Sequence, residues 1–371
     1  MSETDDLPEP DRVEGAPHPR ATLELFGQGA AEAAFLDAFN AGRLHHGWLI
    51  TGPRGVGKAT LAWRIARFLL GQPAEGAPAP DSLDVPPDSS VARRVAALSE
   101  GGLFLLRRAW DEKAKRLKTV ITVDEARRLR DFFGLSSAEG GRRVVIVDAA
   151  DEMNPQAANA ILKLLEEPPA RAALLLISHQ PSRLLPTIRS RCRELRLGPL
   201  DADDMAAALA AAGAAPASED EAGALAALSQ GSVGEAMRIA RLDGLALYAA
   251  IVDLFATLPR LDRTRARALA DQAAGKGAEA RFDLTLRLLD VFLARLARSG
   301  VTGPPAPEAA PGEAALMSRL CPDRRAAREW AEQQQALGNR ARQGRAVNLD
   351  PAALVLDMVL KLDATARKLA A

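Results

Sequence analysis

The chain has 371 residues, and its 48 lysines and arginines are balanced by 48 aspartates and glutamates, so the formal net charge is zero. This balance excludes a chain-wide attraction to nucleic acid or anionic membrane, and the length predicts two or three domains. The two cysteines, Cys192 and Cys321, exclude a disulfide scaffold and a four-thiolate zinc site. No apolar run approaches the roughly 20 residues of a membrane helix, so we expect no membrane partner and a reducing, cytoplasmic compartment.

The composition changes along the chain and predicts its organisation. Residues 1–20 are acidic and proline-rich, and we expect a disordered tail. Residues 21–198 alternate short apolar runs with helical patterns, which is typical of a parallel α/β sheet with helices on both faces. Alanine-rich residues 199–243 predict a small helical domain, and residues 244–371 predict an all-helical domain.

Short apolar runs predict the strands of the sheet. The expected strands lie at residues 48–50, 103–106, 144–147, 174–177 and 195–197. All but the last run, which contains Arg196, are continuously apolar, and we expect strands that are buried on both faces. Between them, Thr122 and Glu125 have capping-box spacing, and Asn154 followed by Pro155 predicts the start of another helix.

A glycine-rich loop follows the first expected strand. Gly52, Gly55 and Gly57 precede Lys58, which opens an expected helix over residues 59–70. In this order of strand, loop and helix, backbone N–H groups converge on a phosphate, and the lysine reaches the terminal phosphates. The motif alone fits a nucleotide site or a glycine-rich turn without a ligand.

Two features weaken this expected site. The residue after the lysine should supply a hydroxyl to Mg²⁺, but it is Ala59, and Thr60 lies about 100° further around the helix. The strand at residues 144–147 ends in Asp148, which could hold a metal through water, but Ala149 follows where hydrolysing enzymes usually have a glutamate. We therefore expect little or no hydrolysis at this site.

A run of charged residues in a sequence is usually a solvated face. A cationic loop and the helix after it could meet DNA phosphates. The candidates for DNA contact are Lys113, Lys115, Arg116, Lys118, Arg127 and Arg130. Asp151 and Glu152 follow the strand that ends at Asp148 and are interpreted as solvated acids.

Two further segments carry a more specific pattern. One runs from Asp148 to Pro169 and ends in Leu165-Glu166-Glu167-Pro168-Pro169, and the other contains Ser190-Arg191-Cys192. Together they resemble the bacterial clamp-loader subunits of the AAA-plus class, over residues 22 to about 242. The resemblance implies an α/β P-loop sheet domain, a small helical lid domain and an all-α C-terminal oligomerisation domain.

The resemblance also implies roles for single residues. Arg191 would be an arginine finger that projects toward ATP bound by a neighbouring subunit, and such a guanidinium stabilises charge on the phosphoryl oxygens. Ser178 matches the position of a polar sensor of the terminal phosphate. Gly234, in the segment Gly231–Gly234, stands where motor subunits have a sensor arginine, and Arg238 and Arg241 nearby are interpreted as ordinary helix residues.

The implied function is therefore that of a stator. Such a subunit is not catalytic by itself and belongs to a DNA polymerase III holoenzyme, whose partners are a motor subunit and a delta subunit in a hetero-pentameric ring, the sliding clamp and primer-template DNA. The implied cofactor is ATP with Mg²⁺, bound without hydrolysis, and no zinc is expected because residues 71–101 contain no cysteine. The alternatives are an ATP-hydrolysing motor subunit of the same family and a metabolite kinase, for which no acceptor domain is found.

Overall fold

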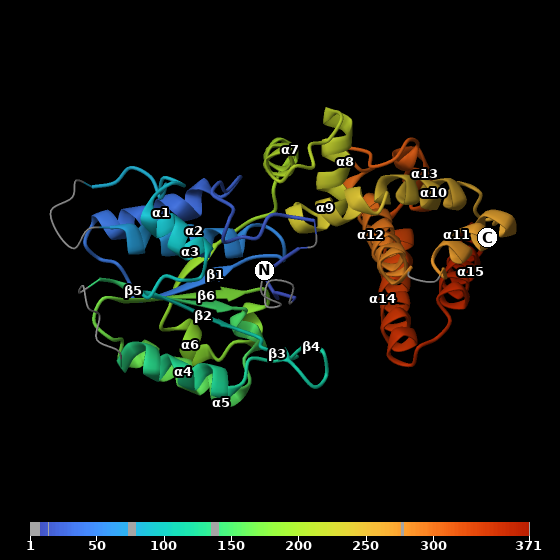
Figure 1. Cartoon of the computed structure of the whole chain (residues 1–371). Coiled ribbons are helices and arrows are strands. Elements are labelled where there is room, and N and C mark those ends of the chain that lie inside the picture. The colour runs from blue at the N-terminus through green and yellow to red at the C-terminus, as the bar shows by residue number, and fades with distance from the viewer. Residues whose placement is uncertain (1–7, 14, 73–78, 135–140, 276–277, 371) are drawn as a thin grey trace. The chain divides into compact units, whose positions relative to one another are not determined.

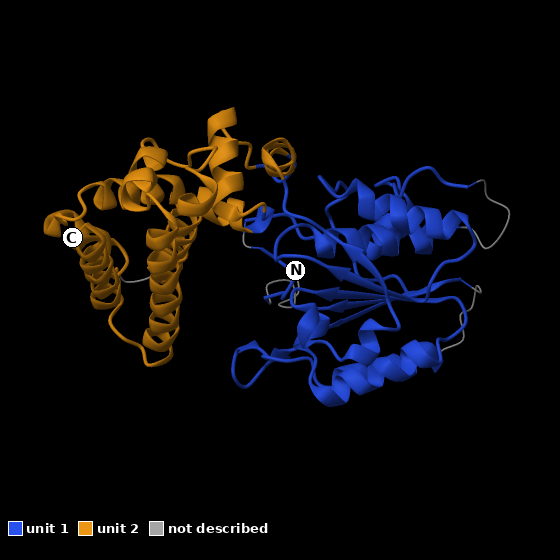
Figure 2. Cartoon of the chain, turned by 180° about the vertical axis from the view of Figure 1, so that it is seen from behind, with its two compact units in different colours: residues 1–200, 211–213, 232–234 blue, residues 201–210, 214–231, 235–371 orange. Residues whose placement is uncertain are grey.

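The computed structural model describes residues 8–13, 15–72, 79–134, 141–275 and 278–370. They form two compact units (Figure 2). The first comprises the chain up to residue 200 with residues 211–213 and 232–234, and the second comprises residues 201–210, 214–231 and 235 onward. A further division of the second unit near residue 243 stays a prediction.

The first unit is a parallel five-stranded sheet between two layers of helices (Figure 1). Its strand order is β2-β5-β6-β1-β7. The strands are β1 (Gly47–Thr51), β2 (Leu103–Arg107), β5 (Arg143–Asp148), β6 (Ala172–Ser178) and β7 (Arg193–Arg196). All five expected strands are confirmed, but burial on both faces is wrong for β2 and β7, because these are the edge strands and most of their residues are half-buried or exposed.

Helices cover both faces of the sheet. On one face lie α1 (Gly29–Asn40), α2 (Lys58–Gly71) and α3 (Ser90–Ala96), and on the other lie α4 (Val123–Gly134), α5 (Pro155–Glu166) and α6 (Pro186–Arg189). Two single turns of 3₁₀ helix are also present, η2 (Ala150–Glu152) and η3 (Pro181–Arg183). Helix α2 is buried almost all round, with Leu61, Trp63 and Ile65 fully enclosed. Each such side chain contributes about 1.5–3 kcal/mol relative to an exposed position.

The helix starts follow the expected local chemistry. The Asn154 side chain accepts a hydrogen bond from the Ala157 N–H at 2.8 Å, and Pro155 is the first residue of α5. At α4, the Glu125 carboxylate accepts from the Thr122 N–H at 2.8 Å. The cap at Asn154 and the Glu125 half of the capping box are confirmed, because each depends on residues only three apart.

The N-terminal segment differs from its prediction. Within residues 8–13 and 15–20, the Glu9 carboxylate accepts from Arg20 and from Arg107 of β2, each at 2.7 Å. Asp11 accepts from Arg107 at 3.0 Å, and its side chain is 1% exposed. The prediction of a disordered tail is therefore wrong for these residues, because distant arginines neutralise the acidic side chains. Residues 1–7 and 14 lie outside the described residues.

The second unit is helical. Its helices are α7 (Ala202–Ala211), α8 (Glu219–Ser229), α9 (Val233–Arg241), α10 (Gly244–Ala256), α11 (Arg263–Gln272), α12 (Glu279–Thr302), α13 (Glu313–Leu320), α14 (Arg324–Ala346) and α15 (Pro351–Ala370), the first residues of α9 belonging to the first unit. Helix α12 packs along α14, and α11 packs along α15. Glu313 is fully buried at the start of α13, where it pairs with Arg295 at 2.7 Å and accepts from the Tyr248 hydroxyl at 2.6 Å.

Candidate functional site

The phosphate-type loop joins β1 to α2. Gly52, Gly55 and Gly57 have φ angles of 141°, 77° and 97°, a region that favours glycine. A Cβ atom on Gly52 would also lie 2.5 Å from the Leu197 carbonyl oxygen. The glycines are thus needed for the path of the loop, whether or not a ligand is bound.

Lys58 does not extend away from this loop. Its ammonium group donates to the carbonyl oxygens of Gly52, at 2.8 Å, and Pro53, and the side chain is buried. Burial lowers the pKa of Lys58 to about 8, although Asp148 and Asp151 oppose this shift. The ammonium group of Lys58 is therefore bonded within its own loop. Ala59 and Thr60 follow it at the start of α2.

The carboxyl ends of the central strands bring the other expected residues together. Thr51 at the end of β1 lies opposite Ser178 at the end of β6, and Asp148 at the end of β5 lies opposite Ile177. Ser178 is fully buried, and its hydroxyl has no hydrogen-bond partner among the described residues. Burial, then the charges of Asp11 and Glu152, raise the pKa of Asp148 to about 7. The predicted nucleotide residues therefore share one edge of the sheet.

Several polar residues of this edge were missed or misread in the sequence. Asp151 is buried and accepts from the His179 N–H at 2.9 Å, and Glu152 pairs with Arg108 at 2.7 Å and with Arg54 at 3.3 Å. The interpretation of both acids as solvated is wrong, because η2 turns them back onto the sheet edge. Burial, with Lys58 and Arg54 nearby, lowers the pKa of His179 to about 4. The signal available was their position directly after strands β5 and β6.

The segment Ser232–Gly234 lies against the phosphate-type loop. It belongs to the first unit, and the Val233 N–H donates to the Gly55 carbonyl oxygen at 2.9 Å. A Cβ atom on Gly55 would lie 2.1 Å from the Ser232 hydroxyl oxygen. The loop and this segment are therefore in direct contact.

Arg191 lies at the opposite end of the strands, at the amino ends of β1 and β7. It directly precedes β7, whose start pairs with the start of β1, and its carbonyl oxygen would lie 3.1 Å from a Cβ atom on Gly47. The phosphate-type loop follows the other end of β1, roughly 16 Å away along five strand residues. The Arg191 side chain is 38% exposed, and its guanidinium contacts Glu166 at 3.0 Å and the Thr187 carbonyl oxygen at 3.1 Å. It therefore does not contact the loop of its own chain.

Cys192, the Arg191 backbone and Leu165 near the end of α5 lie close together around Gly47. A Cβ atom on Gly47 would lie 2.7 Å from Leu165 and 3.3 Å from the Cys192 sulfur, so the three pack closely. His46 Nε2 lies 2.9 Å from the Leu165 carbonyl oxygen. Burial raises the pKa of the Cys192 thiol to about 12, as expected for a core cysteine rather than a nucleophile.

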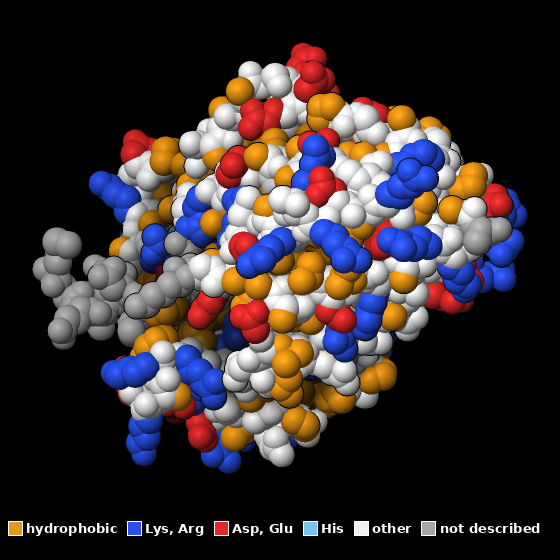
Figure 3. Space-filling model, turned by 90° about the vertical axis from the view of Figure 1, so that its right-hand side faces the viewer, with side chains coloured by type: hydrophobic (Ala, Val, Ile, Leu, Met, Phe, Trp, Pro, Cys, Tyr) orange, Lys and Arg blue, Asp and Glu red, His pale blue; other side chains and the backbone are white. Residues whose placement is uncertain are grey.

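The DNA candidates lie on the hairpin of β3 (Trp110–Asp111) and β4 (Arg116–Leu117) and on α4. Three of them are paired with neighbouring acids: Lys115 with Glu112 at 3.2 Å, Lys118 with Glu125 at 2.8 Å and Arg127 with Asp124 at 3.1 Å. Lys113, Arg116 and Arg130 form no ion pair with another described residue and are exposed. On the face in Figure 3, which is the right-hand side of Figure 1, basic and acidic side chains are intermixed. Because three of the six candidates are already paired with acids, any contact with DNA would be local.

Within the described ranges, no three His, Cys, Asp or Glu side chains are grouped so that they could hold a metal ion. In the same ranges, every helix is too short or too polar to cross a membrane.

The comparisons with known proteins concern mainly the first unit. Residues 27–201 match the family described as DNA polymerase III, delta subunit. The chain is 42% identical to the DNA polymerase III subunit delta' of Pseudomonas aeruginosa over 40% of this chain and 41% of that protein. It is 33% identical to subunit delta' of Escherichia coli, over 44% of this chain and 45% of the relative. These matches thus span less than half of either relative.

A solved structure is similar over a longer stretch but less closely. A gamma subunit-related protein of Thermotoga maritima is aligned over 90% of this chain and 99% of its own, with 17% identity and a TM-score of 0.31. The parallel sheet of the first unit is established by the strand order of this chain, not by that similarity. Residues 27–201 therefore match the DNA polymerase III, delta subunit, family, and the resemblance to bacterial clamp-loader subunits is confirmed.

Proposed function

We propose that the chain is a delta-prime-type subunit of the clamp loader of the replicative DNA polymerase III. It acts as a stator, supplies Arg191 in trans to a neighbouring ATPase and helps to load the sliding clamp on primed DNA. Its partners are a motor subunit and a delta subunit in a hetero-pentameric ring in the cytoplasm. The primer-template is met through the complex, with Lys113, Arg116 and Arg130 as the available cations of this chain.

One observation carries this proposal. Arg191 is partly exposed at the edge of the sheet opposite the phosphate-type loop, so its guanidinium can act only on a phosphate that another chain holds. Its pair with Glu166 is solvent-exposed and is worth at most about 1 kcal/mol, so a polyphosphate can replace it. Such a guanidinium supplies charge stabilisation to phosphoryl transfer without taking part in bond making.

The chain's own loop has the opposite character. The residue after Lys58 has no hydroxyl for Mg²⁺, and no glutamate follows Asp148. The lysine itself donates to two loop carbonyl oxygens. Asp148 and Lys58 are of the right type to hold Mg²⁺ and a phosphate. We therefore propose that ATP with Mg²⁺ binds here weakly and is not hydrolysed.

The test is a reconstituted clamp loader that carries Arg191→Ala. We expect the DNA-stimulated ATPase rate to fall at least about tenfold, since arginine fingers supply larger factors in comparable phosphoryl-transfer sites. Assembly should be unchanged in size-exclusion chromatography. Arg189→Ala is the matched control, because this exposed arginine lies in the same segment. An unchanged rate in an intact Arg191→Ala complex would refute the stator role.

A motor subunit is the second candidate, because Lys58 and Asp148 are both present at the site. Magnesium-dependent hydrolysis by the purified chain alone, abolished by Lys58→Ala, would decide for it. Hydrolysis that persists in the Lys58→Ala variant would indicate a contaminating ATPase.

A further inference from the structure

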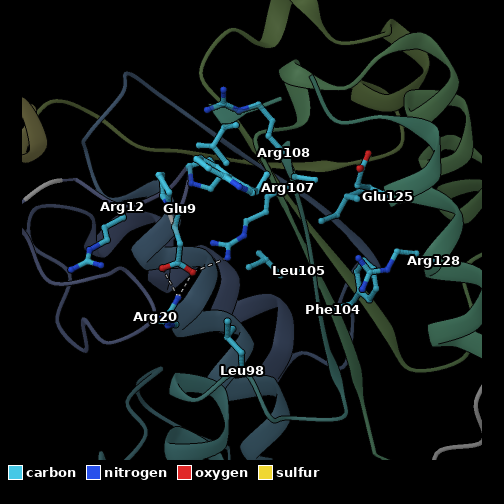
Figure 4. Close-up of a pocket in the computed structure, with 16 residues that line it drawn as sticks. Glu9, Arg12, Arg20, Leu98, Phe104, Leu105, Arg107, Arg108, Glu125 and Arg128 are labelled. Atoms are coloured by element: carbon cyan, nitrogen blue, oxygen red, sulfur yellow. Dashed lines mark hydrogen bonds and ion pairs between the residues drawn. The ribbon is translucent and has the colours of Figure 1, made fainter. Parts of the chain in front are cut away.

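The N-terminal segment reaches the edge of the sheet where nucleotide would bind. We call residues 9–13 the strap. Its two acids are held by Arg107, which lies beside Asp148 in the pairing of β2 with β5. Figure 4 shows Glu9 pointing toward Arg20 and Arg107. The strap is therefore anchored next to the carboxylate that ends the central strand.

The other end of the strap lies at the phosphate-type loop. A Cβ atom on Gly234 would lie 3.2 Å from the Val13 side chain and 3.7 Å from the Gly55 backbone. Val13, Gly234 and Gly55 thus meet at one place, where the loop already touches Ser232. Between its two ends the strap spans the space from Asp148 to the loop.

The charge of the strap also opposes a polyphosphate. The Asp11 carboxylate is almost fully buried, and among the charges near Asp148 it is the one that most raises the pKa of that residue, after burial itself. One Asp11 oxygen has no hydrogen-bond partner among the described residues. A phosphate entering beside it would meet a second buried negative charge, which low dielectric makes costly.

The strap is held mainly by its ionic anchors. A cavity of about 380 Å³ remains between it and β2, lined by Glu9, Arg12, Phe104, Arg107 and Trp110 among others. Apart from Val13, the contacts described above are ion pairs. Losing Arg107 would remove an anchor from both acids at once, and Arg20 and His18 would be left to hold them.

We propose that the strap is an internal competitor of nucleotide: latched by Arg107, it covers the phosphate-type loop and weakens the binding of adenosine triphosphate to this subunit. The inference rests on the proposed nucleotide site at Lys58 and is independent of Arg191. The apparent affinity for nucleotide is then the affinity of the released state multiplied by the fraction of molecules whose strap is released.

The test measures binding and strap release together in the full chain. Binding is followed by titration with a fluorescent ATP analogue and Mg²⁺, and release by hydrogen–deuterium exchange of peptides that cover residues 8–20. We expect Arg107→Ala, and the double variant Glu9→Gln with Asp11→Asn, to increase exchange and to tighten nucleotide binding at least about tenfold. Arg12→Ala is the matched control, an exposed arginine on the strap itself, and should change neither.

Three results would overturn the proposal. If exchange increases and affinity stays the same, the strap is not the obstacle. If affinity increases without a change in exchange, the removed charge and not the release is responsible. If the unaltered chain already binds nucleotide as tightly as the variants, the site is not covered. In each case the effect of Arg191→Ala on the neighbouring ATPase stands as a separate result.

Discussion

The two edges of the central sheet have opposite characters. At the carboxyl edge, Lys58 bonds to its own loop, Asp148 is buried near other acids, and the strap contacts Arg107 beside Asp148 and lies against Gly234. At the amino edge, Arg191 is partly exposed, and among the described residues its guanidinium contacts Glu166 on the surface and one carbonyl oxygen. In the same fold, the phosphate-type loop is occupied by contacts within the chain, whereas the Arg191 side chain is accessible from outside.

The largest effect on stability is expected at the closed edge, with Asp148→Asn. Because the pKa of Asp148 is raised to about 7 from an ordinary value near 3.8, its contribution to stability is present at low pH and is lost as pH rises toward and past 7. The variant should therefore be more stable than the parent at pH 8, by about 1–4 kcal/mol, and the difference should vanish at pH 4.

Urea unfolding at both pH values measures this difference, with the exposed Asp88→Asn as control. Equal gains at pH 4 and pH 8 would contradict a raised pKa. The carboxyl edge would then not be distinguished by a buried, protonated carboxyl group.

A smaller effect is expected at the open edge, with Gly47→Ala. The added methyl group would lie 2.7 Å from Leu165 and 3.1 Å from the Arg191 carbonyl oxygen. We expect a loss of about 1–3 kcal/mol in unfolding free energy, since overpacking forces neighbours to shift. The displacement of Arg191 should also lower the ATPase rate of the loader.

Gly29→Ala is the control, because nothing lies within 4 Å of its added atom. If Gly47→Ala lost stability but kept full ATPase stimulation, the placement of the Arg191 backbone would not matter for function.

The smallest effect is expected for Glu166→Gln. Its pair with Arg191 is exposed, so unfolding free energy should change by less than about 1 kcal/mol. Freed from this carboxylate, the guanidinium should bind the neighbour's phosphate more readily, and the ATP concentration for half-maximal loader activity should fall. Glu167→Gln, next in the chain and also exposed, should leave that concentration unchanged. A rise with Glu166→Gln would mean that the pair positions Arg191 for action instead of restraining it.

Local patterns predicted much of this molecule. The strands, the glycines of the loop and the cap at Asn154 depend on residues close in sequence, and all are found where expected. The strap could not be predicted, because Glu9 and Arg107 are 98 residues apart and composition treats both as solvated charges. The inward bonding of Lys58 depends on side-chain geometry, which the motif does not specify.

The separation of Arg191 from the loop has a consequence for assembly. When each of several identical chains supplies an arginine to one neighbour and accepts one from the other, the chains join head to tail. Such contacts close into a ring or continue as a filament. On the proposed function, this chain supplies an arginine to a neighbour but uses none itself, since nucleotide at its own loop is not hydrolysed. A subunit of this kind would stand at one end of a series of ATPase subunits, where it would complete the last active site and prevent a further subunit from being added in the same way.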